Sequence, residues 1–164
     1  MKILYLMRHA KSSWADPSLD DHDRPLNTRG KKTAPRMGKL IAQEKFPLDY
    51  ILSSTARRAR DTTLLMVKQS QYKGPVDFTR ALYEAHHEDY FPISKKLSDR
   101  YQAVMLVGHN PAMERFFETI TGQYEKMPTA SLAQIELPIQ HWKDLTKKTK
   151  GRLRRIGRPK ELDT

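Results

Sequence analysis

Two histidines and several arginines are the residues of this chain whose types and positions best suit chemistry. Arg8 and His9 directly follow the apolar run "KILYLM", and His109 comes one glycine after the apolar run "AVMLV". A third run, "DYIL", is followed by "SSTARRAR", which contains Arg57, Arg58 and Arg60. Imidazole nitrogens act as nucleophiles or proton carriers, and one guanidinium group can bind two phosphate oxygens at once. These residues would form a phosphate-binding centre if the ends of the three runs met in space.

The apolar runs themselves predict the elements that bring these ends together. Short, nearly unbroken apolar runs are typical of parallel strands that are buried on both faces. We expect such strands at residues 2–7, 49–52, 76–78 and 103–107. Apolar residues at helical spacing predict helices over 28–45, 55–69, 87–97 and 111–121. Segments 131–138 and 151–157 alternate apolar and polar residues, which predicts two strands toward a sheet edge.

This order of elements predicts one α/β domain over residues 1–164. The expected architecture is a three-layer sandwich, with a mainly parallel central sheet flanked by helices and with C-terminal edge strands. Pro35 must kink the first helix or mark the start of its regular part. At the fourth helix, Asn110 is the expected N-cap, Pro111 the first helical residue and Gly122 the C-terminal stop.

The carboxyl ends of parallel strands meet at one sheet edge, where ligands bind in open α/β folds. The histidines and arginines are therefore expected to share an anion pocket there, with helix starts adding backbone donors. No acidic residue directly follows the three runs, which argues against a metal site, and we expect no metal or other cofactor. The chemistry that fits is phosphoryl transfer to His9, with Arg8, Arg58 and His109 holding the phosphoryl oxygens.

A general acid is needed where the leaving group is poor. Glu84 in "RALYEAHHED" is the nearest candidate, and Glu88 and Asp89 remain alternatives. Three residues are candidates for substrate contacts near the pocket: Lys11, Ser13 and Arg57. Ser13 can equally shape the turn, and Arg57 can equally belong to a solvated helix face.

Composition and charge bound the other functions. The chain has 164 residues and no cysteine, which favours a cytoplasmic location, and no apolar run approaches the length of a membrane span. Of the net charge of +11, residues 143–160 carry +8, from nine Lys or Arg and one acid. Such a segment can bind nucleic acid, with Trp142 as the nearby aromatic for base stacking. A cationic edge strand that resists aggregation explains the pattern with fewer assumptions.

Four segments resemble the blocks of a known family, the histidine phosphatase superfamily with its phosphoglycerate-mutase-like fold. They are "LMRHAKSSW", "DRPLNTRG", "LSSTARRARDT" and "LVGHNP", in the family's order from residue 6 to residue 111. The short length, the "RHAKSSW" form and the closing "GRLRRIGRPKEL" are most similar to the SixA branch, the phosphohistidine phosphatases.

The resemblance implies a phosphoenzyme intermediate on His9. It matches Arg8 and Arg58 to the two phosphate-binding arginines and His109 to the second histidine. Glu84 falls where larger members carry their acid, a position that the small branch does not hold reliably. Thr55 replaces the Pro that commonly follows the family's Ser, which should alter the loop more than the chemistry.

The sequence therefore predicts a metal-independent phosphatase that acts on phosphohistidine in a partner protein. Larger relatives build lids from insertions, whereas the short connections here predict a pocket open to a protein side chain. The labile N–P bond also lessens the need for a strong acid. The alternatives are a small-molecule phosphomonoesterase and, from another class, a non-catalytic phosphate- or nucleic-acid-binding protein.

Overall fold

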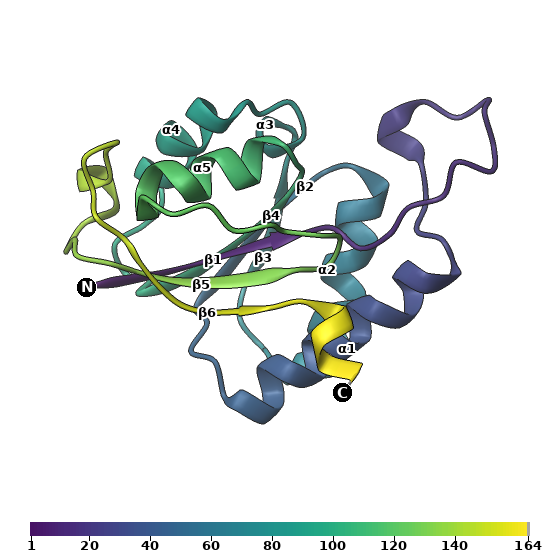
Figure 1. The fold of residues 1–164 in the computed structure, drawn as a ribbon, viewed down its shortest axis with the longest axis horizontal. Coiled ribbons are helices and arrows are strands. Elements are labelled where there is room, and N and C mark those ends of the chain that lie inside the picture. Colours follow the sequence, from purple (N-terminus) through teal and green to yellow (C-terminus); the bar gives the residue numbers. More distant parts are fainter. Residues whose placement is uncertain (164) are drawn as a thin grey trace.

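A six-stranded sheet forms the middle layer of the computed structural model, which describes residues 1–163 (Figure 1). The strand order is β3-β2-β4-β1-β5-β6. The four strands β1, β2, β3 and β4 are parallel, and β5 and β6 are antiparallel, with β6 at the edge. The strands are β1 (Lys2–Arg8), β2 (Tyr50–Ser54), β3 (Val76–Thr79), β4 (Ala103–Gly108), β5 (Leu132–Leu137) and β6 (Arg152–Gly157). The predicted α/β class, parallel core and C-terminal edge strand are confirmed.

Helices cover both faces of this sheet (Figure 1). One face carries α1 (Thr28–Glu44) and α2 (Arg57–Ser70). The other carries α3 (Arg80–Tyr83), α4 (Tyr90–Lys95) and α5 (Ala112–Thr121). Short 3₁₀ helices complete the chain: η1 (Asp21–Asp23), η2 (His87–Asp89), η3 (Trp142–Asp144) and η4 (Pro159–Asp163). No helix among residues 1–163 is both long enough and apolar enough to cross a membrane.

The central strand β1 shows why its sequence is an unbroken apolar run. Leu4 and Leu6 belong to one buried cluster, which includes Phe116 of α5. Tyr5 and Met7 belong to a second buried cluster on the opposite face, which includes residues of α1 and α2. Because successive side chains of a strand point to opposite faces, both sets must be apolar. Burial on two faces fixes the position of the residues that follow this strand.

Three predicted helix features differ from the structure. The expected helix over 87–97 is a 3₁₀ turn followed by α4, because Pro92 has no N–H to bond the Glu88 carbonyl. The regular part of helix α1 does not start at Pro35, because the helix runs from Thr28 to Glu44 across this residue, and the alternative, a kink at Pro35, stays a prediction. Helix α5 begins at Ala112 with Pro111 at its N-cap, one residue later than predicted. The Asn110 side chain still accepts a hydrogen bond from the Glu114 N–H, at 3.3 Å.

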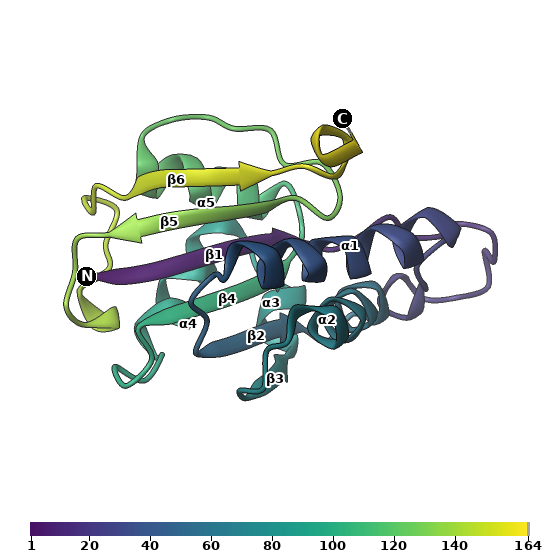
Figure 2. The same cartoon turned by 90° about the horizontal axis from the view of Figure 1, so that it is seen from below.

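The carboxyl ends of β1, β2 and β4 lie at one edge of the molecule (Figure 2). The chain returns to this edge at its end, where η4 follows β6 beside α1 (Figure 2). The Lys-rich connection that contains η3 lies at the opposite edge. The basic C-terminal segment is therefore divided between two ends of the sheet.

Gly30, in the first turn of α1, lets this helix approach the loop after β1. A Cβ atom at this position would lie far inside van der Waals distance of the Lys11 carbonyl oxygen. The same carbonyl accepts a hydrogen bond from the Asn27 N–H at 3.0 Å. The start of α1 therefore holds the segment that follows His9.

Gly30→Ala should lower the free energy of unfolding by about 1–3 kcal/mol, the usual cost of overpacking. Helix propensity alone predicts the opposite sign, a gain of up to about 1 kcal/mol. Denaturant unfolding measures the change, with Lys32→Ala at an exposed site of the same helix as the control. A stabilised Gly30→Ala protein would show that the contact with Lys11 is not tight.

Candidate active site

The loop after β1 is tied by its backbone to three other parts of the chain. The His9 N–H donates to the Gly108 carbonyl at 3.1 Å, and the Ala130 N–H donates to the His9 carbonyl at 2.9 Å. The Ala10 N–H donates to the Thr62 hydroxyl oxygen on α2 at 2.9 Å. The hydroxyl of Thr62 in turn donates to the Arg58 carbonyl at 2.6 Å. These bonds connect the two segments that carry His9 and Arg58.

The ring of His9 has one nitrogen that is hydrogen-bonded and one that has no hydrogen-bond partner within residues 1–163. Its Nδ1 lies 2.7 Å from the Ala10 carbonyl oxygen, which can only accept a hydrogen bond, so Nδ1 carries the ring proton. This leaves a lone pair on Nε2. The side chain is only 6% exposed, and its ring centroid lies 5.1 Å from that of His109. His9 is therefore held in the tautomer that leaves the lone pair of Nε2 available for bonding.

The ring of His109 is fixed by Ser54 at the end of β2. The Ser54 Oγ accepts from the Ala56 N–H at 3.1 Å and lies 2.8 Å from Nε2 of His109. Ser54 is fully buried, so its hydroxyl proton needs an acceptor, and Nε2 provides one. The ring proton of His109 then sits on Nδ1, a buried atom without a hydrogen-bond partner among the described residues. This N–H is available to an anionic ligand.

Two arginines place positive charge beside the histidines. Arg58 is held by Asp21: its Nη1 donates to the Asp21 carbonyl at 2.7 Å and its Nη2 to the carboxylate at 3.0 Å. Arg8 donates from Nη1 to the Met127 carbonyl at 3.2 Å. Both Nε atoms are buried and have no partner among residues 1–163. Together with His109, they offer donors that suit the oxygens of a phosphoryl group.

Burial and positive charge keep both histidines neutral. Burial lowers the pKa of His9 to about 3, and His109, Arg58 and Arg8 act in the same direction. Burial also lowers the pKa of His109 to about 4, with a further effect from Arg58. At neutral pH the Nε2 lone pair of His9 is therefore not lost to protonation.

Asp21 is a carboxylate that the structure places beside Arg58 and His109. It lines a cavity of about 300 Å³ together with Arg58, Tyr83 and His109. Burial alone would raise the pKa of Asp21, but hydrogen bonds from Tyr83 and Arg58, with the charge of Arg58, lower it. Asp21 is thus an ionised group that holds Arg58, and sequence reasoning missed it. The available signal was its place just before the "DRPLNTRG" segment.

The other predicted site residues lie elsewhere. Glu84 is 62% exposed, pairs with Arg80 at 2.8 Å and lines a different cavity, so the structure does not bring it to the histidines. Arg57 pairs with Asp61 on the surface of α2. Ser13 accepts a hydrogen bond from the Ala15 N–H at 3.0 Å and so shapes the turn. Lys11 is exposed and lines a second cavity, which also borders Arg8.

Two alternatives for the acid also lie outside the site. Glu88 is exposed and lies 3.7 Å from the His87 ring, and Asp89 accepts from the His86 N–H at 2.8 Å. In the part of the chain that the structure describes, no three His, Cys, Asp or Glu side chains gather in a way that could hold a metal ion.

Comparison with known proteins identifies the family. Residues 4–110 match the sequence model of the histidine phosphatase superfamily (branch 1). The chain belongs to this superfamily, and it is a phosphatase of α/β architecture.

Two solved structures and one further relative are similar to this chain over most of its length. The structure assigned as phosphohistidine phosphatase SixA of Agrobacterium tumefaciens is 32% identical, with a TM-score of 0.82 over 96% of this chain and 98% of that one. A protein histidine phosphatase SixA in complex with tungstate has the same fold, with a TM-score of 0.82 at 17% identity over 98% of this chain and 99% of that one. An uncharacterized protein of Mycobacterium tuberculosis is 31% identical over 85% of this chain and 91% of its own.

Replacing Asp21 by Asn should lower kcat/KM about 10- to 100-fold, because Arg58 loses the charge that orients it. The loss should be equal for substrates with good and poor leaving groups. Steady-state kinetics with two aryl phosphates measures this, with Asp23→Asn at a mainly exposed neighbour as the control. A loss concentrated on the poorer leaving group would instead make Asp21 a general acid.

The lowered pKa values of His9 and His109 also predict acid sensitivity. Below about pH 6.5 both histidines are protonated in the unfolded chain but stay neutral in the folded protein. The free energy of unfolding therefore falls as the pH drops toward 4. Each ring should contribute up to about 1.4 kcal/mol per pH unit. Denaturant unfolding at several pH values gives the free energy of unfolding as a function of pH. The slope of this function between pH 6.5 and pH 4 should be shallower in His9→Asn and in His109→Gln than in the unsubstituted protein. His141→Asn, which removes an exposed ring, supplies the reference slope, and identical slopes in all four proteins would contradict this account.

Proposed function

We propose that this phosphatase removes phosphoryl groups from phosphohistidine in a partner protein, through a phosphoenzyme intermediate on His9. Nε2 of His9 is the proposed nucleophile. Arg8, Arg58 and the Nδ1–H of His109 bind the phosphoryl oxygens and offset their charge. No step requires a metal ion.

The observation that carries the substrate class is the state of Asp21. Asp21 is the one residue with a carboxyl group among the described residues that line the cavity with His109. Arg58 and Tyr83 keep this carboxyl group ionised. An ionised carboxylate cannot protonate a leaving group. Alkyl phosphate esters, which leave as poorly stabilised alkoxides, are therefore badly served by this site. An imidazole leaving group does not need that proton.

The first step exchanges one P–N bond for another. Nε2 of His9 bonds to phosphorus while the P–N bond of the substrate breaks, and the bonding pair stays on the substrate nitrogen. A substrate ring protonated on its other nitrogen leaves as neutral imidazole. His9 keeps its proton on Nδ1, bonded to the Ala10 carbonyl, so the phosphorylated ring carries a positive charge. This charge makes His9 a good leaving group in turn.

The second step is hydrolysis. The oxygen of a water molecule bonds to phosphorus, the P–N bond to His9 breaks, and the bonding pair returns to Nε2. One water proton is released to solvent, and the other remains on the phosphate. The net reaction converts phosphohistidine and water into histidine and phosphate.

The connection between β3 and β4 supports a substrate as large as a protein. Leu82, Tyr90 and Phe91 of this connection are buried in the core cluster with Phe116. Much of its length is thus used for packing and does not extend as a lid. A site without a long lid can receive a side chain that is attached to another protein.

The nucleic-acid alternative loses support in the structure. Trp142 is fully buried, so it cannot stack on a base. Three of the C-terminal arginines pair with acids: Arg154 with Glu136, Arg155 with Glu44 and Arg158 with Glu125. The charge is therefore partly neutralised as well as divided between two edges.

Turnover of a phosphohistidine peptide should exceed turnover of an alkyl phosphate by at least about 100-fold in kcat/KM, the usual minimum contribution of a general acid. Aryl phosphates should show rates that fall steeply as the leaving-group pKa rises. All assays are run in EDTA. His9→Ala should abolish activity on every substrate, and His141→Ala, at an exposed histidine that pairs with Asp99, should retain it.

Each contrary result has a distinct meaning. Comparable turnover of one alkyl phosphate would favour the small-molecule phosphomonoesterase. Activity retained by His9→Ala would refute the nucleophile, and loss of activity in EDTA would refute the metal-independent mechanism.

A further inference from the structure

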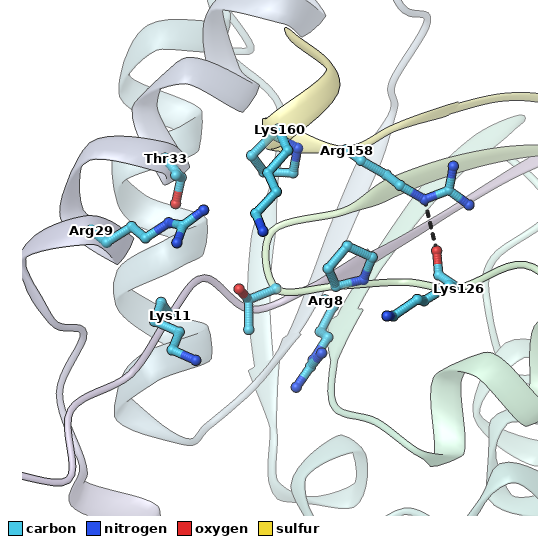
Figure 3. Close-up of a pocket in the computed structure, with 10 residues that line it drawn as sticks. Arg8, Lys11, Arg29, Thr33, Lys126, Arg158 and Lys160 are labelled. Atoms are coloured by element: carbon cyan, nitrogen blue, oxygen red, sulfur yellow. Dashed lines mark hydrogen bonds between the residues drawn. The ribbon is translucent and has the colours of Figure 1, made fainter. Parts of the chain in front are cut away.

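A second cavity, of about 410 Å³, borders Arg8 (Figure 3). It lies between the loop after β1, the first turns of α1, the segment before β5 and the chain end at η4. Its charged lining is entirely basic: Arg8, Lys11, Arg29, Lys126, Arg158 and Lys160. Like charges gathered in one concave space repel each other unless an anion is present.

One of these cations is already neutralised. Arg158 donates to Glu125 at 2.8 Å, to Glu161 at 3.2 Å and to the Lys126 carbonyl at 2.9 Å. Its guanidinium points away from the centre of the cavity (Figure 3). Arg158 thus fixes the position of the segment that carries Lys126.

The remaining five cations form no ion pair within the described chain. Arg29 from α1 and Lys160 from η4 point into the same space, and the Lys126 amine points toward Arg8 (Figure 3). They come from segments far apart in the sequence, so the fold itself gathers them. The segment after β6 therefore contributes Lys160 to this cavity, in addition to the contribution of β6 to the sheet.

Arg8 connects this cavity to the catalytic site. Burial lowers the pKa of the Arg8 guanidinium, the nearby Glu114 carboxylate raises it, and the charge of Arg58 lowers it, so Arg8 lies within electrostatic range of the second arginine of the site. The same side chain lines the basic cavity. A substrate whose phosphoryl group is bound by Arg8 can therefore extend a neighbouring group among these cations.

We propose that the basic cavity binds a second oxyanion of the substrate, a carboxylate or a phosphate, beside the phosphoryl group that is transferred. The proposal deepens the proposed function and rests on it only in taking Arg8 as part of the phosphoryl site. The second oxyanion comes from an acidic or phosphorylated side chain near the phosphohistidine, or from a second phosphate of a small substrate.

Alkane bisphosphonates of increasing chain length test this proposal, because their P–C bonds resist hydrolysis and their length measures the separation of the two sites. Titration calorimetry should show that one length binds at least about tenfold more tightly than methylphosphonate, a difference of about 1.4 kcal/mol. Arg29→Ala and Lys160→Ala should each remove most of that advantage. Lys39→Ala, at an exposed position of the same helix as Arg29, and Lys143→Ala, at the opposite edge, make the same charge change and should preserve it.

Equal affinity for all lengths and for methylphosphonate would overturn the proposal. An equal loss of the bisphosphonate advantage in Lys39→Ala and Lys143→Ala would also overturn it, because it would show that the net charge of the protein alone attracts the ligand. Calorimetry does not depend on turnover, so a bisphosphonate advantage in a protein with no phosphatase activity would refute the proposed function and leave the second site standing.

A kinetic comparison then identifies the source of the second oxyanion. Two phosphohistidine peptides that differ only in flanking Glu or Ala residues are compared with a monophosphate and a bisphosphate ester. A preference for the acidic peptide, lost in Lys160→Ala, assigns a protein side chain, and a preference for the bisphosphate ester assigns a small substrate. The absence of both preferences would overturn the proposal for catalysis.

Discussion

The site depends on one hydrogen bond, from Nδ1 of His9 to the carbonyl oxygen of Ala10. It decides which ring nitrogen carries the proton, and so which one can attack phosphorus. In the proposed mechanism it also keeps the proton in place once Nε2 is phosphorylated, so that the ring leaves as neutral imidazole. The bond is only as fixed as the backbone of the loop, which is why this loop is bonded to β4, to α2 and to the segment before β5.

Cations that lie close together in a protein interior repel each other, and here each arginine has its own hydrogen-bond acceptors. Asp21 takes two hydrogen bonds from Arg58, while a main-chain carbonyl takes one from Arg8. The histidines remain neutral, so they add donors without adding charge. The result is a positively charged site that still contains an unprotonated imidazole nitrogen, as the proposed phosphoryl transfer requires.

Much of this could be predicted from the sequence, because strand ends in a parallel sheet share an edge. The runs around Leu4 and Val104 mark buried strands, and they place His9 and His109 together without knowledge of any contact. Glu84 could not be placed, because its direction depends on a short helix and on its pairing with Arg80. Asp21 was missed because it lies in the long connection before α1, where no periodicity constrains the chain and where its place just before the "DRPLNTRG" segment is the one available signal. The basic cavity was also out of reach, since Arg29 and Lys160 meet only through the return of β6.

The central claim is that phosphorus is bonded to His9 during turnover. The most direct measurement is rapid quenching at alkaline pH, which preserves phosphoimidazole, followed by peptide mapping of the phosphorylated residue by mass spectrometry. The account predicts phosphate on the peptide that contains His9 and its loss on treatment with acid. Phosphate on His109 or on a serine, or turnover with phosphate on no residue at any quench time, would contradict it.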